Sequence, residues 1–121
     1  MVAEKPSLAE AITKILSRGR FETRQGRAGP CKIHEYRDGA NKYIVTSVCG
    51  HVFSIDFLAK FNNWQSTDPA ELFIAGVKKE EANPKLHIAK HLKDEAKKAD
   101  HLVLWLDCDK EGENICFEVM E

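Results

Sequence analysis

A short apolar run that ends directly in a dense group of carboxylates most constrains how this chain can fold. The run covers residues 101–106, with the sequence HLVLWL, and has the length and composition of a strand buried on both faces. The sequence DCDKEGE follows at residues 107–113, and residues 114–120 read as part of a helix. We therefore expect four carboxylates at the carboxyl end of a buried strand, in the turn that leads into a helix.

The spacing of these carboxylates predicts a site for a hard divalent cation. Asp107, Asp109 and Glu111 repel one another unless a positive charge lies between them. Mg²⁺ prefers a few carboxylates together with water and phosphate oxygens, so it is the expected ion. Gly112 would let the backbone turn closely between the acidic loop and the helix. The alternative is a solvated helix start, because acidic side chains are favoured in the first turn of a helix.

A further carboxylate lies near the other end of the chain. Glu4 follows the short apolar stretch MVA, and Pro6 and Ser7 are typical of a helix start. The helix is expected from Ser7 to Arg18, with Gly19 after its end. In an open parallel sheet the carboxyl ends of the strands face one crevice, so Glu4 is expected to lie near Asp107.

Three stretches, in this order, resemble the Toprim domain of type IA topoisomerases. They are VAEKPSLAEAI at residues 2–12, SVCGHVFSIDF at 47–57 and LDCDKEGENICFEV at 106–119. In detail they are similar to eukaryotic topoisomerase III, most closely to its beta branch, although Lys110 stands where many relatives carry Arg. The resemblance implies an α/β Toprim (Rossmann-like) fold: a central, mostly parallel sheet of about four strands flanked by helices, with an inserted hairpin. It also implies that residues 1–121 are a single domain of a larger topoisomerase whose tyrosine-bearing domains lie outside this stretch.

The resemblance also implies roles for individual side chains. Asp107, Asp109 and Glu111 match the family's acidic triad, which binds Mg²⁺, and Glu4 is expected to contribute to the same metal site. Glu4 also matches the general acid–base residue, which gives a proton to the 3′ oxygen leaving on strand cleavage and recovers it on resealing. Lys5 matches the lysine that contacts the scissile phosphate.

Histidines and one further acid are weaker candidates. His51, within SVCGHV, could reach a phosphate or the acidic loop, although a lone histidine beside apolar residues more often packs. Glu113 is expected either to contact the metal ligands without binding the metal itself, or to stabilise the first turn of the helix. His87 and His91 are four residues apart and could share a metal in principle. With no third ligand evident, we expect both on the surface.

The function implied by the resemblance is Mg²⁺-dependent breakage of one strand, passage of another strand and resealing. The expected partners are single-stranded DNA, RNA as well for the beta branch, and the remaining topoisomerase domains in cis, with a nuclear and also cytoplasmic location. The isolated chain is expected to be inactive and to bind Mg²⁺ weakly. Two alternatives stay open: another Toprim enzyme such as a primase or nuclease, and a non-enzymatic α/β interaction module whose acids cap a helix.

The length and composition are typical of one domain, and the basic and acidic side chains are concentrated in different segments of the chain. The chain has 121 residues, is 43% hydrophobic and has a net charge of −1. Residues 18–42 hold seven basic and three acidic side chains, whereas residues 107–121 hold six acidic and one basic. A basic segment of this kind could meet phosphates. The four cysteines lack metal-site spacing and are expected to be free thiols. No apolar run is long enough to span a membrane, so no membrane partner is expected.

The rest of the chain predicts a hairpin, a connection and a helix. Residues 31–36 and 42–48 read as two strands joined through Asp38 and Gly39. A helix is expected from Asn83 to Ala99, with a run of lysines on its solvated side. The connection over residues 60–81 is expected to be held on the core by apolar side chains, namely Phe57, Phe61, Trp64, Leu72 and Phe73.

Overall fold

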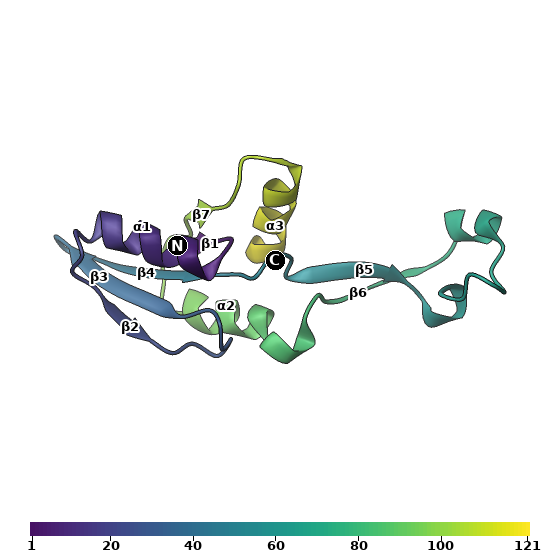
Figure 1. Ribbon diagram of the computed structural model, residues 1–121, viewed down its shortest axis with the longest axis horizontal. Coiled ribbons are helices and arrows are strands. Elements are labelled where there is room, and N and C mark those ends of the chain that lie inside the picture. Colours follow the sequence, from purple (N-terminus) through teal and green to yellow (C-terminus); the bar gives the residue numbers. More distant parts are fainter.

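The computed structural model describes all 121 residues and consists of a five-stranded sheet, covering helices and a long two-stranded arm (Figure 1). The strands are β1 (Val2–Ala3), β2 (Glu22–Arg24), β3 (Ile33–Asp38), β4 (Asn41–Ser47), β5 (Phe53–Phe57), β6 (Val77–Glu81) and β7 (Leu104–Trp105). The α-helices are α1 (Pro6–Leu16), α2 (Ile88–Ala96) and α3 (Lys110–Met120). Three short 3-10 helices, η1 (Ala59–Phe61), η2 (Pro69–Phe73) and η3 (Pro84–Leu86), complete the chain.

Parallel strands form the part of the sheet that matters for the candidate site. The strand order is β2-β3-β4-β1-β7, and β1 pairs in parallel with both β4 and β7. The predicted hairpin is present as β3 and β4, which pair antiparallel, and β2 pairs antiparallel with β3. The predicted α/β fold, with a central sheet flanked by helices, is confirmed. The sheet has five strands in place of about four, and two of its four strand pairings are parallel.

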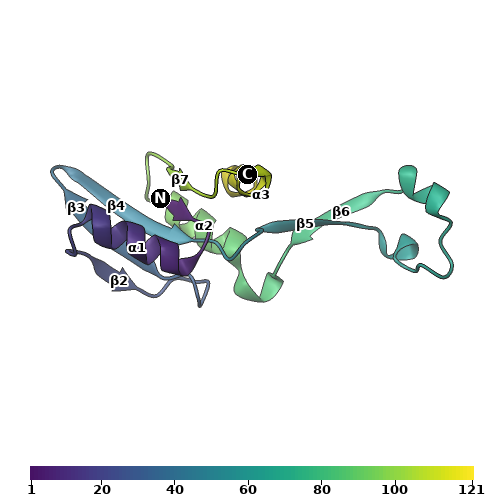
Figure 2. The ribbon, with the colours of Figure 1, turned by 45° about the horizontal axis from the view of Figure 1, so that its top comes forward.

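The short strand β1 joins two hydrophobic cores because its two residues face opposite sides of the sheet. Val2 belongs to the core that also holds Ile88 of α2 and Ile115 of α3. Ala3 belongs to the other core, with Ile12 of α1. Figure 2 shows α1 lying along the face of the sheet formed by β3 and β4. The backbone that leads into Glu4 is therefore held by packing on both faces.

The apolar run at residues 101–106 does not form a strand buried on both faces, so that expectation is wrong. Only Leu104 and Trp105 pair, as β7, and β7 lies at the edge of the sheet. The side chains of Leu102 and Trp105 are 51% and 41% exposed. The run is apolar enough for an interior strand, but it has a neighbouring strand on one side alone.

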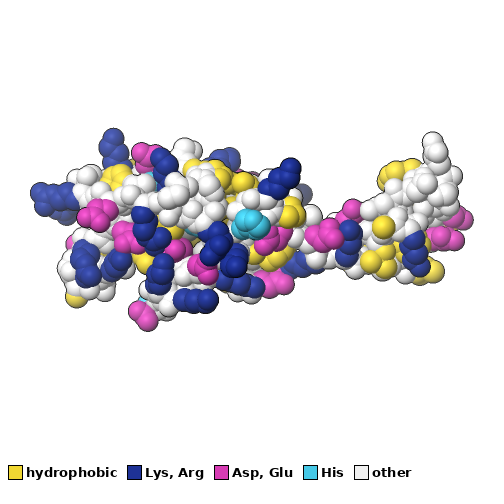
Figure 3. Space-filling model, turned by 90° about the horizontal axis from the view of Figure 1, so that it is seen from below, with side chains coloured by type: hydrophobic (Ala, Val, Ile, Leu, Met, Phe, Trp, Pro, Cys, Tyr) yellow, Lys and Arg dark blue, Asp and Glu magenta, His cyan; other side chains and the backbone are white.

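The helix expected over residues 83–99 is shorter and is interrupted. A 3-10 turn comes first, and His87 then adopts a left-handed backbone conformation with a φ of 53°. Helix α2 starts after this break, at Ile88. The five lysines of the expected run, two within α2 and three beside it, are exposed as expected. Figure 3, which looks at this side of the molecule, shows Lys and Arg gathered over the body.

The connection over residues 60–81 does not pack on the core, so that expectation is also wrong. Strands β5 and β6 form a separate antiparallel ladder that projects from the body, with η1 and η2 at its tip (Figure 1). The side chains of Trp64 and Phe73 at the tip are 84% and 92% exposed. Measured against the dimensions of a lipid bilayer, every helix in the structure is too short or too polar to cross it.

Candidate metal and phosphate site

Glu4 and Lys5 lie where β1 gives way to α1. The strand ends at Ala3, and the helix begins at Pro6, with Lys5 in extended conformation as its N-cap residue. The side chain of Glu4 is 15% exposed, and its Oε1 lies 3.5 Å from Nζ of Lys5, whose side chain is 66% exposed. The backbone of Glu4 is held in place because the strand before it packs on both faces. The ammonium group of Lys5 beside it is open to solvent.

The acidic loop is shaped by a close approach at Gly112. An ideal Cβ at this position would lie 2.0 Å from the carbonyl oxygen of Asp107, so only glycine fits. Oδ1 of Asp109 accepts a hydrogen bond from the Gly112 amide at 2.7 Å and caps the N-terminus of α3. The tight turn expected at Gly112 is therefore present, and one carboxylate does cap the helix, as the alternative interpretation expected.

Topology brings the acidic loop and Glu4 to the same edge of the sheet. Val2 is in register with Leu104, and Ala3 with Trp105, so Glu4 and the loop after β7 both follow neighbouring strand ends. The donor set suits a hard cation, because all of its members are carboxylate oxygens. The structure nevertheless gathers no three acidic, histidine or cysteine side chains into a group that could hold a metal.

The separation of these carboxylates has two structural reasons. The pairing of β7 ends at Trp105, so the segment containing Asp107, Asp109 and Glu111 leaves the sheet, and its side chains are exposed. Like charges also favour spreading into solvent. Glu113 is exposed in the first turn of α3. The assignment of Glu4, Asp107, Asp109 and Glu111 as metal ligands thus stays a prediction.

His51 contacts Glu118, not the acidic loop, and sequence reasoning missed this partner. Nδ1 of His51 lies 3.0 Å from Oε1 of Glu118. The other carboxylate oxygen accepts the backbone amides of Val52 at 2.7 Å and Phe53 at 3.2 Å. Burial opposes ionisation of Glu118, but these hydrogen bonds outweigh it and lower the pKa of its carboxyl group. Glu118 therefore anchors the start of the arm to α3.

Two arginines of the basic segment at residues 18–42 form ion pairs with acids of the sheet and of α2. Arg24 pairs with Glu35 and with Glu95 of α2, and Arg27 pairs with Asp94. These carboxylates raise the pKa of Arg24, against the effect of burial. Because Arg24 and Arg27 are paired with these acids, we interpret the two side chains as a link between β2 and α2, not as phosphate ligands.

His91 lies inside the protein, contrary to the surface position expected from the sequence. Its side chain is 1% exposed, and Nε2 lies 2.8 Å from Oγ1 of Thr46 on β4. Burial lowers the pKa of its imidazole, so the neutral form is favoured in the folded chain. His91 is a core residue that links α2 to the sheet.

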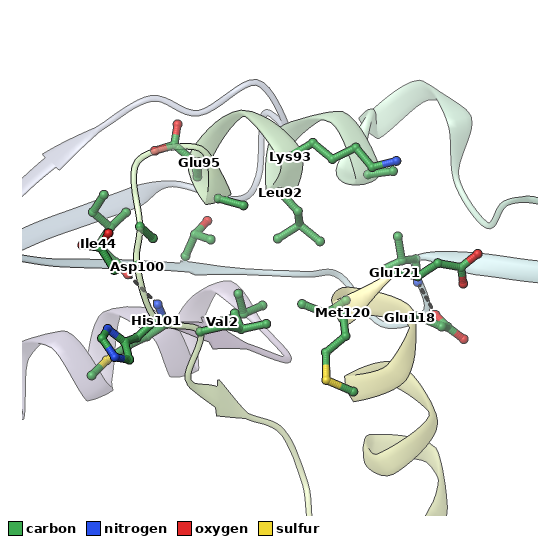
Figure 4. A pocket seen from close by; sticks show the side chains of 18 of the residues that line it. Val2, Ile44, Leu92, Lys93, Glu95, Asp100, His101, Glu118, Met120 and Glu121 are labelled. Carbon is green, nitrogen blue, oxygen red and sulfur yellow. Dashed lines mark hydrogen bonds between the residues drawn. The ribbon is translucent and has the colours of Figure 1, made fainter.

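A cavity of about 340 Å³ lies between α2, the sheet and the end of α3 (Figure 4). Its wall is mainly apolar and includes Val2, Leu92 and Met120, with His101 and Glu118 at its margin. None of the predicted metal ligands lines it. The cavity and the acidic edge are therefore separate features.

The comparison with protein families gives the context for this arrangement. The family model described as the Toprim domain matches residues 1–121, which is the whole chain. The chain belongs to the Toprim domain family. Strand β1 followed by Glu4 and Lys5, and strand β7 followed by the acidic loop, are thus parts of a Toprim domain, as the sequence motifs indicated.

Curated relatives add the branch that this Toprim domain resembles. It is 56% identical over 126 residues to DNA topoisomerase 3-beta-1 of Homo sapiens, covering 100% of this chain and 15% of that protein. DNA topoisomerase 3-beta of Arabidopsis thaliana is 53% identical over 126 residues, covering 100% and 14%. DNA topoisomerase 3-alpha of Arabidopsis thaliana is 48% identical over 124 residues, covering 99% and 13%. The resemblance to topoisomerase III, and to its beta branch before its alpha branch, is confirmed, and the chain spans about 15% of the length of these relatives.

Proposed function

We propose that this Toprim domain supplies the metal-binding and proton-transferring half of a type IA topoisomerase III. The observation that carries the proposal is the shared edge: Glu4 and the acidic loop follow neighbouring parallel strands in a chain that matches the Toprim family throughout. In such an enzyme a tyrosine outside this domain attacks one strand and holds its 5′ phosphate. DNA is the expected substrate, as the names of the relatives indicate. RNA as a second substrate, and a nuclear and cytoplasmic location, are proposed from the resemblance to the beta branch alone.

Each residue has a distinct part in this proposal. Glu4 gives its proton to the departing 3′ oxygen and takes it back when the strand is resealed. Lys5 places a positive charge beside the scissile phosphate, for which its exposed side chain is well placed. Asp107, Asp109 and Glu111 are the proposed ligands of Mg²⁺, which when bound neutralises charge on the phosphate oxygens. Glu4 adds a further oxygen donor at the same edge.

A Mg²⁺ titration of the chain, followed by NMR of the side-chain carboxyl carbons, tests the proposed ligands. The expected result is saturable shifts at Asp107, Asp109 and Glu111, and at Glu4 across the strand boundary, with weak affinity. Asp107→Asn should reduce the shifts at the other three positions. Asp38→Asn is the matched control, because Asp38 is an exposed acid at the β3–β4 turn. Shifts spread evenly over the surface acids would contradict the proposal and favour simple helix capping.

A relaxation assay separates the domain's contribution from that of the whole enzyme. Because the proposed tyrosine lies outside residues 1–121, the purified chain with Mg²⁺ should leave supercoiled DNA unchanged. Relaxation by the pure chain would show that the nucleophile has been assigned to the wrong part of the protein. In the topoisomerase that contains this domain, Glu4→Gln should lower both cleavage and resealing, since a single residue serves both proton transfers.

A further inference from the structure

Two cysteine side chains, each just outside a different strand, meet at one place in the body. Cys31 precedes β3 and Cys49 follows β4, and their Sγ atoms lie 3.3 Å apart. Since β3 and β4 are paired neighbours, both positions are held by the sheet. Cys108 and Cys116 make no such sulfur contact. The pair is therefore set apart from the other thiols by geometry.

The two thiols differ in their access to solvent. Cys31 is completely buried within the core that includes Val48 and Val52, whereas Cys49 is exposed. Burial raises the pKa of the Cys31 thiol to about 12, so it stays protonated and unreactive toward external reagents. An oxidant dissolved in water therefore meets Cys49 first, with Cys31 directly behind it.

The geometry points to a reversible oxidation site in which Cys49 is the thiol attacked by a peroxide and Cys31 is the thiol that resolves it. The peroxide transfers one oxygen atom to Cys49, which becomes a sulfenic acid, and water or an alcohol leaves. The Cys31 sulfur then forms a bond to the Cys49 sulfur, and the sulfenic oxygen leaves as water with the Cys31 proton. The two thiols together lose two electrons, and the peroxide bond gains them. A disulfide has its sulfur atoms about 2.05 Å apart, so the closing movement is only about 1.3 Å.

The position of this site links oxidation to the proposed catalytic edge. The amide of Val48 donates a hydrogen bond to the carbonyl oxygen of Ala3 at 2.9 Å. In the register of β1 with β4, Val48 lies beside Glu4, and Cys49 is the next residue. A disulfide would tie the carboxyl end of β4 to the start of β3. Oxidation would thus fix the backbone beside Glu4 and Lys5 without consuming any proposed metal ligand.

Oxidation of the purified, reduced chain by hydrogen peroxide tests the inference. Remaining thiols are alkylated, and the products are analysed by intact mass and peptide mapping. We expect two of the four thiols to be protected from alkylation, a peptide linking Cys31 to Cys49, and full reversal by dithiothreitol. A disulfide that includes Cys108 or Cys116, or an over-oxidised Cys49 with no link to Cys31, would overturn the assignment.

Two matched variants keep the test independent of folding. Cys49→Ser changes an exposed side chain and should abolish the disulfide, leaving Cys31 at least tenfold slower to oxidise than Cys49 in the unmodified chain. Cys108→Ser, at another exposed cysteine, should form the disulfide at the unchanged rate. Equal oxidation of Cys31 in the presence and absence of Cys49 would show that the buried thiol reacts by itself and that the proposed order is wrong.

Discussion

The close approach at Gly112 gives the sharpest test of how the acidic loop is built. In Gly112→Ala the new Cβ would lie 2.0 Å from the carbonyl oxygen of Asp107 and within 3.0 Å of two further Asp107 backbone atoms. Non-bonded heavy atoms are comfortable at about 3.5 Å, so the backbone of one segment must move by about 1.5 Å. Side-chain rotation cannot relieve the clash, because the atoms that collide are all main-chain atoms.

The expected loss of stability can be worked from three effects. Overpacking of this kind costs up to about 3 kcal/mol. Displacing the Gly112 amide also weakens the Asp109 cap, which is worth about 1 kcal/mol. Alanine regains about 1 kcal/mol over glycine through its helix propensity. The net free energy of unfolding should therefore fall by about 3 kcal/mol, a drop of about 12 °C in Tm for a domain of this size.

Thermal unfolding by circular dichroism, with Gly29→Ala as the control, measures this effect. A Cβ at Gly29 meets no atom within 4 Å and needs no left-handed backbone, so that variant should unfold near the unmodified chain. If Gly112→Ala instead matched Gly29→Ala in Tm, the tight turn between Asp107 and α3 would not exist in solution. Hydrogen exchange at the first turn of α3 would show whether the loss is local.

Further predictions concern the buried histidines and the root of the arm. Burial lowers the pKa of His91 and His34, so the unfolded chain binds more protons than the folded chain as pH falls through about 6.5. The free energy of unfolding should therefore fall with decreasing pH, by up to about 1.4 kcal/mol per pH unit for each histidine. Urea unfolding between pH 5 and 7 measures how steeply the free energy of unfolding depends on pH. This dependence should be about half as steep in His91→Gln, because His34 alone remains, and unchanged in the exposed control His101→Gln. An unchanged dependence in His91→Gln would place the proton uptake elsewhere. Glu118→Ala leaves two backbone amides without their acceptor, at a cost of about 1–3 kcal/mol, and should speed their hydrogen exchange, while Glu113→Ala should not. Equal exchange in both variants would mean that the carboxylate does not anchor the arm.

Local sequence was enough to predict the family and the order of the site elements. The stretch around Glu4 and the stretch around Gly112 each contain their own turn chemistry, with Pro6 at a helix start and a glycine that no other residue can replace. The parallel register of β1 with β7 follows once both stretches are assigned to strand ends. These features could be read from the sequence because each depends on residues close together in the chain.

The features that could not be predicted depend on distant packing. An apolar run such as residues 101–106 has the same composition whether it lies inside a sheet or at its edge, and here β7 is an edge strand. Trp64 and Phe73 are apolar enough for a core, yet the arm carries them away from it. His91 offered a usable signal, because it lies three residues after the buried Ile88 on one face of α2, but the surrounding lysines obscured it.

The difference in support between Glu4 and the acidic loop bears on how the proposed site would work. Glu4 follows a strand packed on both faces, whereas Asp107, Asp109 and Glu111 are exposed beyond an edge strand of two residues. Any cation bound there must draw these carboxylates together against their repulsion, and one oxygen of Asp109 is already used to cap α3. Part of the binding energy would therefore be consumed in ordering the loop, which is why we expect weak affinity in the isolated domain. A nucleic-acid phosphate placed beside Lys5 would supply further oxygen ligands, so metal and substrate should each strengthen the binding of the other.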